Sequence, residues 1–372
     1  MIDQKRLSDI LERIKQTKVG VGGDYCLDAY WLLDARLPEL SIETGKPTSA
    51  VVKQRYSLGG AGNIVNNLVD LEVGIVYSFG VISDDIFGRE MLQQLEQPRV
   101  HRTGTSQVRV DISGMVIQHE GWDTPVYAKP YLGREEQNRI DFGRFNSIAH
   151  ATEEKLIAAF RAALPSLDAL IVNQQLPSGI YSETIVQALN RLATEYPGKV
   201  FILDSRNRSD EFHNMICKIN ACEAARVCGE TKEFNELVRI DDLKRYAQEI
   251  FRRSQRTVFI TRSGRGILLF DGRAFFEIPG IQLLKKIDPV GAGDTTVAAI
   301  AAALASGASL EEAGILGNLA SAVTVQKLQQ TGTATPEELM EMARTADSIF
   351  HPAFGRESSF YHRIENKSIK KK

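Results

Sequence analysis

Short apolar stretches alternate with helix-like spacing along most of the chain. These stretches lack the strict alternation of a half-buried strand, and such runs are typical of strands covered on both faces. Strands of this kind separated by helices favour a parallel sheet between helical layers. The pattern therefore predicts an α/β fold with a mostly parallel central sheet. The expected strands are 18–22, 75–80, 169–172, 200–203 and 258–261.

Two segments do not fit this alternation. Residues 39–57 are irregular and contain Pro47 and β-branched runs, while apolar and polar residues alternate from about 100 to 131. We expect both to contribute to a small antiparallel sheet that projects from the main body, as a lid over a substrate would. The alternative is that they form ordinary additional edge strands.

Composition narrows the functional class. The 372 residues are 43% hydrophobic and 25% charged, with a formal net charge of −2, which is ordinary for a soluble globular protein. Such a balance gives no positive field to attract nucleic acid, and the short basic run at the C-terminus is expected to be a solvated tail. No stretch approaches the ~18 apolar residues of a membrane helix. The N-terminus has the spacing of an amphipathic helix, not of a signal peptide.

The cysteines indicate the compartment. Cys26, Cys217, Cys222 and Cys228 form no Cys-x-x-Cys pair, and no neighbouring histidine completes a zinc site. Free thiols in a reducing cytosol are the preferred interpretation. The sequence therefore predicts a cytoplasmic protein with neither a nucleic-acid nor a membrane partner.

The segment Gly291-Ala292-Gly293-Asp294 carries the sharpest chemical signal. An alanine-rich run from 297 to 305 follows it, so a helix is expected to begin near Asp294. Glycines at a helix start let backbone N–H groups approach an anion, which the helix dipole also favours. An anion site with a carboxylate beside it suits phosphoryl transfer, in which the carboxylate accepts a hydroxyl proton. The alternative is that Asp294 is only a helix cap.

Two weaker glycine turns lie earlier in the chain. The turn 59–63 ends in Asn63, whose amide both donates to and accepts from a sugar hydroxyl. The turn 22–24 follows the first strand and carries Asp24, with Asp28 four residues on. Loops at strand ends of open α/β sheets collect ligand contacts, so acidic groups there suit sugar hydroxyls. The glycines at 20–23 lack the spacing of a dinucleotide fingerprint.

These motifs, in this order, resemble the PfkB/ribokinase family. The resemblance runs from about residue 17 to 340 and rests on Gly-Gly-Asp at 22–24, on 59–63, on Asn220-Ala-Cys-Glu223 and on 291–294. It implies a ribokinase-like three-layer sandwich with a small β lid and an ATP-dependent carbohydrate kinase activity. We expect a kinase domain at 1–345, with lid pieces at about 39–57 and 100–131, and a C-terminal tail at 346–372.

The resemblance also implies a role for each matching residue. Asp294 matches the catalytic base, and the anion hole matches Gly291, Ala292 and Gly293. Asn220 and Glu223 match the motif that organises Mg²⁺ and phosphates through water. The positions that line ATP match Thr261, Ser263, Gly266 and Asn318. The sugar contacts match Asp24, Asp28, Gly59, Gly60 and Asn63. A monovalent cation site, with K⁺ as the candidate, matches Asp288 and Val290.

Three positions depart from the usual pattern. Gly62 stands where alanine is usual, and Pro289 stands where threonine or valine is common. Proline fixes its own φ but leaves its carbonyl free, so catalysis should survive, whereas the cation site is more affected. Arg206 occupies a position where heptose kinases tend to carry lysine, and either holds a phosphate or is a solvated charge.

Two segments, 137–142 and 261–263, resemble the family members that phosphorylate a heptose phosphate. Arg109, Lys129 and Arg139 are candidates to hold a phosphate already on the sugar, against the alternative of solvated charges. No His-x-Gly-His motif is present, so a kinase without a nucleotidyltransferase domain is expected. Family resemblance also favours a homodimer through the lid. The alternatives are a kinase of another sugar or a nucleoside, and a non-catalytic sugar or nucleotide sensor.

Overall fold

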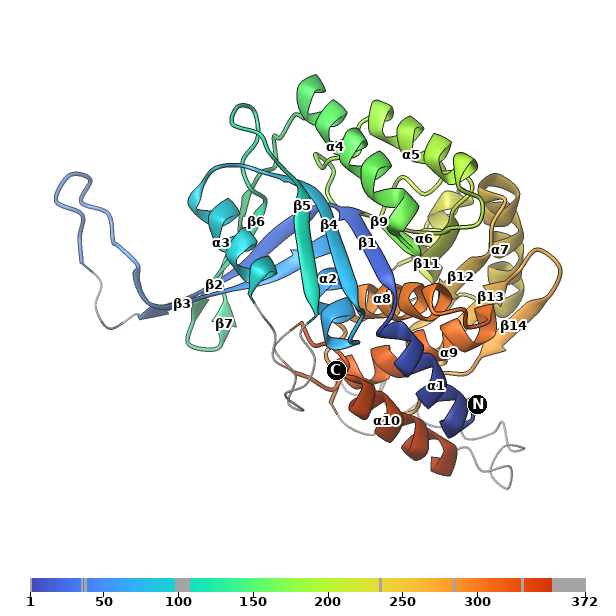
Figure 1. Cartoon of the computed structure of the whole chain (residues 1–372). Coiled ribbons are helices and arrows are strands. Elements are labelled where there is room, and N and C mark those ends of the chain that lie inside the picture. Colours follow the sequence, from blue (N-terminus) through green and yellow to red (C-terminus); the bar gives the residue numbers. More distant parts are fainter. Residues whose placement is uncertain are drawn as a thin grey trace.

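The computed structural model describes residues 2–34, 36, 39–97, 108–233, 236–283, 286–328 and 331–349. It confirms the predicted α/β class: helices cover a large, mostly parallel sheet, and a smaller sheet extends from one side (Figure 1). None of the helices in these ranges is both long and apolar enough to cross a membrane.

The large sheet has nine strands in the order β14-β13-β12-β11-β10-β9-β1-β4-β5. All neighbours from β12 to β5 are parallel, and β13 and β14 add an antiparallel edge. The carboxyl ends of the parallel strands therefore meet at one edge, where ligand sites of open sheets form. The strands are β1 (Lys18–Gly23), β4 (Ile75–Ile82), β5 (Arg109–Ile117), β9 (Ala169–Gln174), β10 (Val200–Ser205), β11 (Ile216–Asn220), β12 (Val258–Thr261), β13 (Ile267–Phe270) and β14 (Phe275–Ile278).

Helices cover both faces of this sheet. Apolar side chains of one face pack with those of α1 (Gln4–Ile14), α2 (Ala61–Asp70), α8 (Ala292–Ala305), α9 (Leu310–Thr324) and α10 (Pro336–Ile349). The other face packs with α4 (His150–Ala163) and α5 (Glu183–Glu195), and farther along with α6 (Ala221–Val227) and α7 (Ile240–Ser254). Because helices cover both faces of the large sheet, its strands are continuous apolar runs in the sequence.

Helix α8 is the most enclosed helix near the site. Its alanines from 298 to 303 are fully buried together with Ile300, so the helix contacts other elements on all sides. Gly317 of α9 lies directly against Ile300, because a Cβ there would sit 2.9 Å from its Cγ1. Small residues let α8 lie close to α9 and to the sheet, which fixes the position of the α8 N-terminus.

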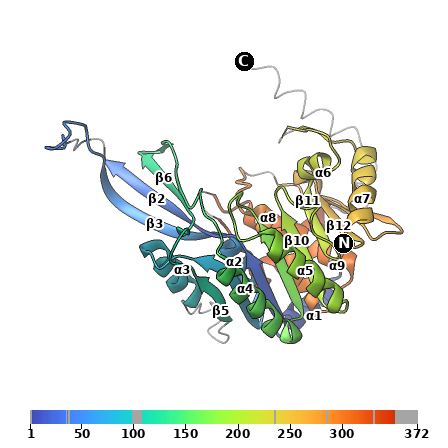
Figure 2. The ribbon, with the colours of Figure 1, turned by 90° about the horizontal axis from the view of Figure 1, so that it is seen from above.

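The smaller sheet projects from the body, as the view from above shows (Figure 2). Its strands are β2 (Tyr25–Asp34), β3 (Ala50–Gly60), β6 (Val126–Leu132), β7 (Glu135–Glu136) and β8 (Ile140–Phe142). β2 lies between β3 and β6, while β7 and β8 both pair with β6. The sheet is mixed and not antiparallel as expected, because β2 and β6 run parallel. One face of this sheet packs against α3 (Ile86–Glu96), where the Phe87 ring contacts Tyr56 and Phe142.

The expected lid piece at about 100–131 divides between the two sheets. β6 joins the smaller sheet, whereas β5 extends the large sheet parallel to β4, as in the edge-strand alternative. The reason is that β5 has apolar side chains on both faces, with Val110 packing on one apolar cluster and Val116 on the other. Residues 98–107 and 350–372 lie outside the described residues. The expected tail at 346–372 begins within α10, which continues to Ile349.

Candidate active site

The α8 N-terminus is built from a glycine turn. Gly291 adopts φ of +81°, a left-handed conformation that favours glycine, and no side chain caps the helix. Asp294 lies in the first turn, one residue beyond Gly293. Its carboxylate accepts hydrogen bonds from Asn63 Nδ2 at 2.7 Å and Gln175 Nε2 at 3.1 Å. Asp294 therefore does not cap α8, and its carboxylate is turned toward α2 and the end of β9.

The surroundings of Asp294 suit a proton acceptor. Burial raises the pKa of Asp294 to about 6, with Asp204 adding to the rise, while Asn63, Lys218 and Gln175 oppose it. A carboxylate with a pKa near 6 is largely ionised at neutral pH, yet binds a proton more readily than an ordinary aspartate.

The Asp24 carboxylate makes contacts other than the predicted ones. It is 2% exposed, and its carboxylate accepts hydrogen bonds from the backbone N–H groups of Gln175, Leu176 and Ile180 at 2.7, 2.8 and 2.9 Å. Burial raises its pKa to about 6, although these three donors pull it down. Asp24 thus holds the loop after β9 and does not point into the cleft, which corrects the predicted sugar contact. Gln175, which sequence reasoning missed, is positioned by this loop.

The turn between β3 and α2 lies against the same group of residues. Gly60 has φ of +55°, and a Cβ there would sit 2.3 Å from the Asp24 carbonyl oxygen. A Cβ on Gly59 would sit 3.1 Å from Asp28 Oδ2. Asp28 itself pairs with Lys129 of β6 at 2.7 Å. The structure therefore brings Asp28, Gly59 and Gly60 together near the start of α2, from which Asn63 contacts Asp294.

A buried ion pair lies beneath the α8 N-terminus. Lys218 of β11 is 5% exposed, and its Nζ lies 3.0 Å from Asp204 Oδ1 at the end of β10. A Cβ on Gly293 would lie 3.2 Å from this Nζ, so the ammonium is next to the glycine turn. Burial alone would lower the pKa of Lys218, but Asp204 and Glu223 outweigh it, and the pKa stands above its usual value. Lys218 was not among the predicted residues.

The Asn220–Glu223 motif starts α6 as a capping box. Asn220 Oδ1 accepts from the Glu223 N–H at 2.9 Å, and Glu223 Oε2 accepts from the Asn220 N–H at 3.0 Å. Burial raises the pKa of Glu223, and Lys218 opposes the rise. The described residues contain no group of three side chains that would coordinate a metal directly. This arrangement fits Mg²⁺, which keeps several waters and needs few protein ligands when phosphates supply the rest.

A hollow of about 350 Å³ runs from the glycine turn toward α9. The lining from the turn after β12 and the α8 N-terminus, called the polar end, includes Thr261, Ser263, Gly266 and Gly293. The lining from the chain after β14 and from α9 is largely apolar and is called the apolar end. It contains Ile281, Leu283, Ile287, Ala322 and Val325, with the polar side chains of Gln282, Asn318 and Ser321 among them. The hollow thus has the division that a nucleotide requires, with phosphates at the polar end and a base at the apolar end.

The remaining predicted residues lie around this centre or away from it. Asp288 and Val290 lie in the turn before α8, where the Val290 N–H donates to Asp288 Oδ1 at 3.1 Å. The cation site stays a prediction. Arg109 begins β5 opposite Ile75, at the amino end of the sheet. Its predicted contact with a substrate phosphate is therefore wrong.

Arg139 and Arg206 belong to different parts of the fold and lie near the same tyrosine. Arg139 follows the lid strand β7, pairs with Asp141 at 2.6 Å and lies over the Tyr127 ring at 4.2 Å. Arg206 follows β10 of the body, is exposed, and has no carboxylate partner in the described part of the chain. Both guanidinium groups act electrostatically on the Tyr127 hydroxyl, so they border a shared region.

Comparison with solved structures supports this architecture. Phosphofructokinase-2 from Escherichia coli in complex with potassium matches with a TM-score of 0.67 and 19% identity, over 89% of this chain and 99% of that one. Arabidopsis thaliana ribokinase complexed with ribose and ATP matches with a TM-score of 0.62 and 19% identity, over 88% and 98%. At this identity the likeness concerns the fold.

Curated relatives and a family model match most of the chain. A protein from Wolinella succinogenes named bifunctional protein HldE is 28% identical over 89% of this chain, and one of the same name from Paramagnetospirillum magneticum is 26% identical over 91%. The matches cover 66% of each relative, so the chain spans just under two thirds of their length. The model of the pfkB family carbohydrate kinases matches residues 27–338. The chain therefore belongs to the pfkB family of carbohydrate kinases.

Proposed function

We propose that this protein transfers the γ-phosphoryl group of ATP to a hydroxyl of a sugar or sugar phosphate. The observation that carries the proposal is the carboxylate of Asp294, held by Asn63 and Gln175 at the junction of two cavity walls. On one side lies the hollow suited to a nucleotide, and on the other lie Asp28 and the glycines of the β3–α2 turn.

The chain's own groups have distinct tasks in this reaction. Asp294 accepts the proton of the attacking hydroxyl, and Asn63 and Gln175 keep the carboxylate oriented. The backbone N–H group of Gly293 at the N-terminus of α8, together with Lys218, stabilises negative charge on the transferred phosphoryl group, whereas the Ala292 N–H already donates to the Pro289 carbonyl oxygen at 3.2 Å. Mg²⁺ supplies charge neutralisation of the phosphates when bound, and Asn220 and Glu223 orient its water shell. A monovalent cation such as K⁺ at Asp288 and Val290 belongs to the same proposal.

The sugar is proposed to carry a phosphate already, with a heptose phosphate as the first candidate. The support is the similarity to HldE proteins and the two arginines, Arg139 and Arg206, that border the cleft. A phosphate at neutral pH carries more than one negative charge and is usually held by such groups. Lys129 is already paired with Asp28 and is the weaker candidate for this role.

Other assignments fit less well. A kinase of another sugar or a nucleoside would use the same base and anion site, but would leave Arg206 without an anionic partner. A non-catalytic sensor has no need of a carboxylate whose pKa is raised beside an anion site.

We also propose a homodimer formed through the smaller sheet. Strand β3 is an edge of that sheet, and Val51 and Val52 on it are 49% and 61% exposed. Edge strands with exposed apolar residues seek partners. The four cysteines are free thiols, which supports a reducing, cytoplasmic setting as part of the proposal.

Asp294→Asn is the first test. The amide keeps the shape of the side chain and removes the base, so kcat should fall by at least about 10²-fold. ATP binding, measured by calorimetry, should be nearly unchanged. The control is Asp241→Asn, an exposed position at the start of α7, which should leave kcat unchanged. A variant at position 294 that keeps most of its activity would remove Asp294 from the mechanism.

The pH dependence gives a second test. Since the base works only when ionised, kcat/KM should fall about tenfold per pH unit below the raised pKa of about 6 for Asp294. Gln175→Leu removes a donor that lowers this pKa, so the acid limb should move to higher pH. Gln187→Leu, on the exposed side of α5, is the matched control. An acid limb that stays in place in Gln175→Leu would contradict the assignment.

The substrate phosphate gives a third test. The ratio of kcat/KM for heptose 7-phosphate to that for the unphosphorylated heptose should fall about tenfold or more in Arg139→Ala and in Arg206→Ala, because each change removes a charge-assisted hydrogen bond. Arg109→Ala, at the opposite end of the sheet, is the control and should leave the ratio unchanged. Equal efficiency of the native enzyme on the two sugars would sink the sugar-phosphate assignment and leave the kinase assignment intact.

A further inference from the structure

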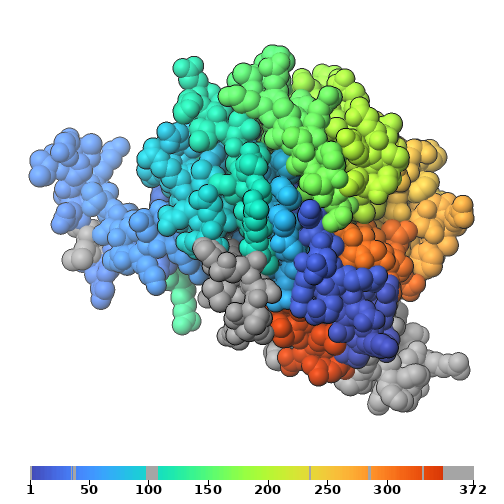
Figure 3. All heavy atoms as spheres, in the orientation of Figure 1, coloured from blue at the N-terminus to red at the C-terminus, as the bar shows by residue number. Residues whose placement is uncertain are grey.

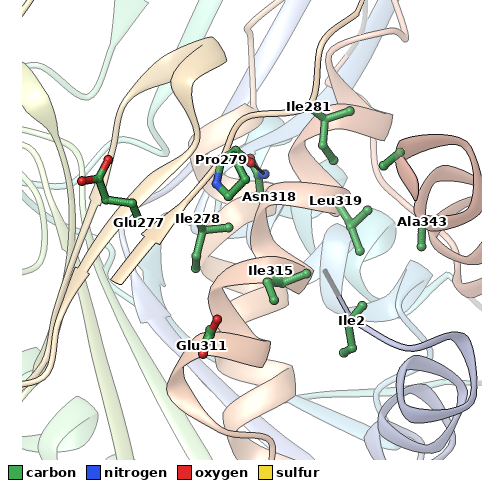
Figure 4. A pocket seen from close by; sticks show the side chains of 11 residues that line it. Ile2, Glu277, Ile278, Pro279, Ile281, Glu311, Ile315, Asn318, Leu319 and Ala343 are labelled. Carbon is green, nitrogen blue, oxygen red and sulfur yellow. Dashed lines mark hydrogen bonds between the residues drawn. The ribbon is translucent and has the colours of Figure 1, made fainter. Parts of the chain in front are cut away.

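A second, smaller hollow lies among the end of β14, α9 and α10 (Figure 4). It adjoins the nucleotide hollow, because the two share lining residues. Its volume is about 100 Å³, and apolar side chains from four elements surround it, while Glu277 and Glu311 lie at its margin. The apolar lining consists of Ile2, Ile278, Pro279, Ile281, Ile315 and Leu319, with Ala343 and Ala346 of α10.

Among the described residues, Ile281 and Asn318 are the two that line both hollows. Asn318 projects from α9, and its Nδ2 donates a hydrogen bond to the Pro279 carbonyl oxygen at 2.8 Å. This bond joins α9 to the chain that follows β14. The side chain of Asn318 and the segment 278–281 therefore form the wall between the two hollows. Figure 4 shows Asn318 beside Pro279 in the lining of the smaller one.

The wall is held rigidly from the nucleotide side. A Cβ on Gly266 would lie 2.1 Å from the Ile278 carbonyl oxygen, and a Cβ on Gly280 would lie 2.0 Å from the Gly264 carbonyl oxygen. The turn 263–266 and the segment 278–280 thus lie backbone against backbone. The side chains of Ile281 and Asn318 contribute to the wall without being part of this contact, and Asn318 is the polar one of the two.

The direction of a bound nucleotide follows from the proposed function, on which this inference rests. With its phosphates at the α8 N-terminus, the base lies at the apolar end, against Ile281 and Asn318. The Pro279 carbonyl accepts and cannot donate, so the amide nitrogen of Asn318 must face it. The amide oxygen remains as an acceptor, which complements the six-position amine of adenine and not the six-position oxygen of guanine.

We propose that Asn318 sets the size and type of base that this kinase accepts, by binding the six-position amine of adenine and closing the apolar hollow behind it. The hollow is then a latent site for an apolar substituent on that amine. Its volume is smaller than the ~150 Å³ of a cavity that holds benzene, so a short alkyl chain suits it better than an aromatic ring.

The test compares binding of ATP, GTP and N6-butyl-ATP by titration calorimetry, and their use as phosphoryl donors, in the native enzyme and in Asn318→Ala. The native enzyme should bind ATP at least about tenfold more tightly than either analogue. In Asn318→Ala the affinity for N6-butyl-ATP relative to ATP should rise by at least about tenfold, because the alkyl chain becomes buried in the hollow. The preference for ATP over GTP should shrink in the same variant.

Ile315→Ala is the matched control, because it enlarges the smaller hollow and leaves the wall in place. It should not improve binding of N6-butyl-ATP. A native enzyme that binds the three nucleotides equally overturns the inference without any variant, and so does an Asn318→Ala protein that binds ATP but gains nothing for the analogue. A native enzyme that binds none of them overturns the proposed function, and this inference falls with it.

Discussion

The buried residue Asp24 is the point on which the arrangement of the site depends. Its backbone N–H donates to the Asn173 carbonyl, its backbone carbonyl accepts from Ala61, and its carboxylate accepts three further N–H groups from the loop after β9. One residue thus joins β1, β9 and α2. Gly60 and Gly179 approach it so closely that a Cβ at either position would lie within about 2.3 Å of an Asp24 oxygen. A buried carboxylate that accepts hydrogen bonds from several backbone N–H groups fixes the positions of the segments that carry them.

This arrangement also determines the surroundings of the Asp294 carboxylate. Asn63 comes from the helix that Asp24 anchors, and Gln175 comes from the loop that Asp24 holds. Both donors of the Asp294 carboxylate are therefore positioned by the same buried group. On its other side, Lys218 lies among the carboxylates of Asp204, Asp294 and Glu223, all of which act on it electrostatically. A single ammonium among three carboxylates leaves an excess of negative charge, which suits a centre completed by a divalent cation and phosphates.

Contiguous motifs explain how much could be predicted from the sequence. The turn before α8 and the turn before α2 each carry their glycines and their polar side chain within a few residues, so their geometry is local. Gln175 and Lys218 are single side chains at strand ends, and their proximity to Asp294 follows from the order of strands in the sheet. A signal existed for Lys218, since a lysine within the apolar strand 216–219 needs a buried partner. The position of β5 in the large sheet could not be predicted for the same reason, because it depends on the elements that cover the two faces of this strand.

The residues of the site differ in how far the fold encloses them. Asp294, Lys218 and the glycine turn belong to elements enclosed in the body, where α8 is buried on all sides. Tyr127 and Lys129 belong to β6 of the smaller sheet, and Arg139 directly precedes its strand β8. The blue part of this sheet extends from the body (Figure 3). None of these three side chains is buried, whereas Leu27, Val126 and Ala128 of the same sheet belong to the apolar cluster that also contains α8. Changes at the three outer positions therefore alter charge and shape without changing the packing of the helix that carries Asp294, while changes at the buried positions of the sheet affect the core that the two share.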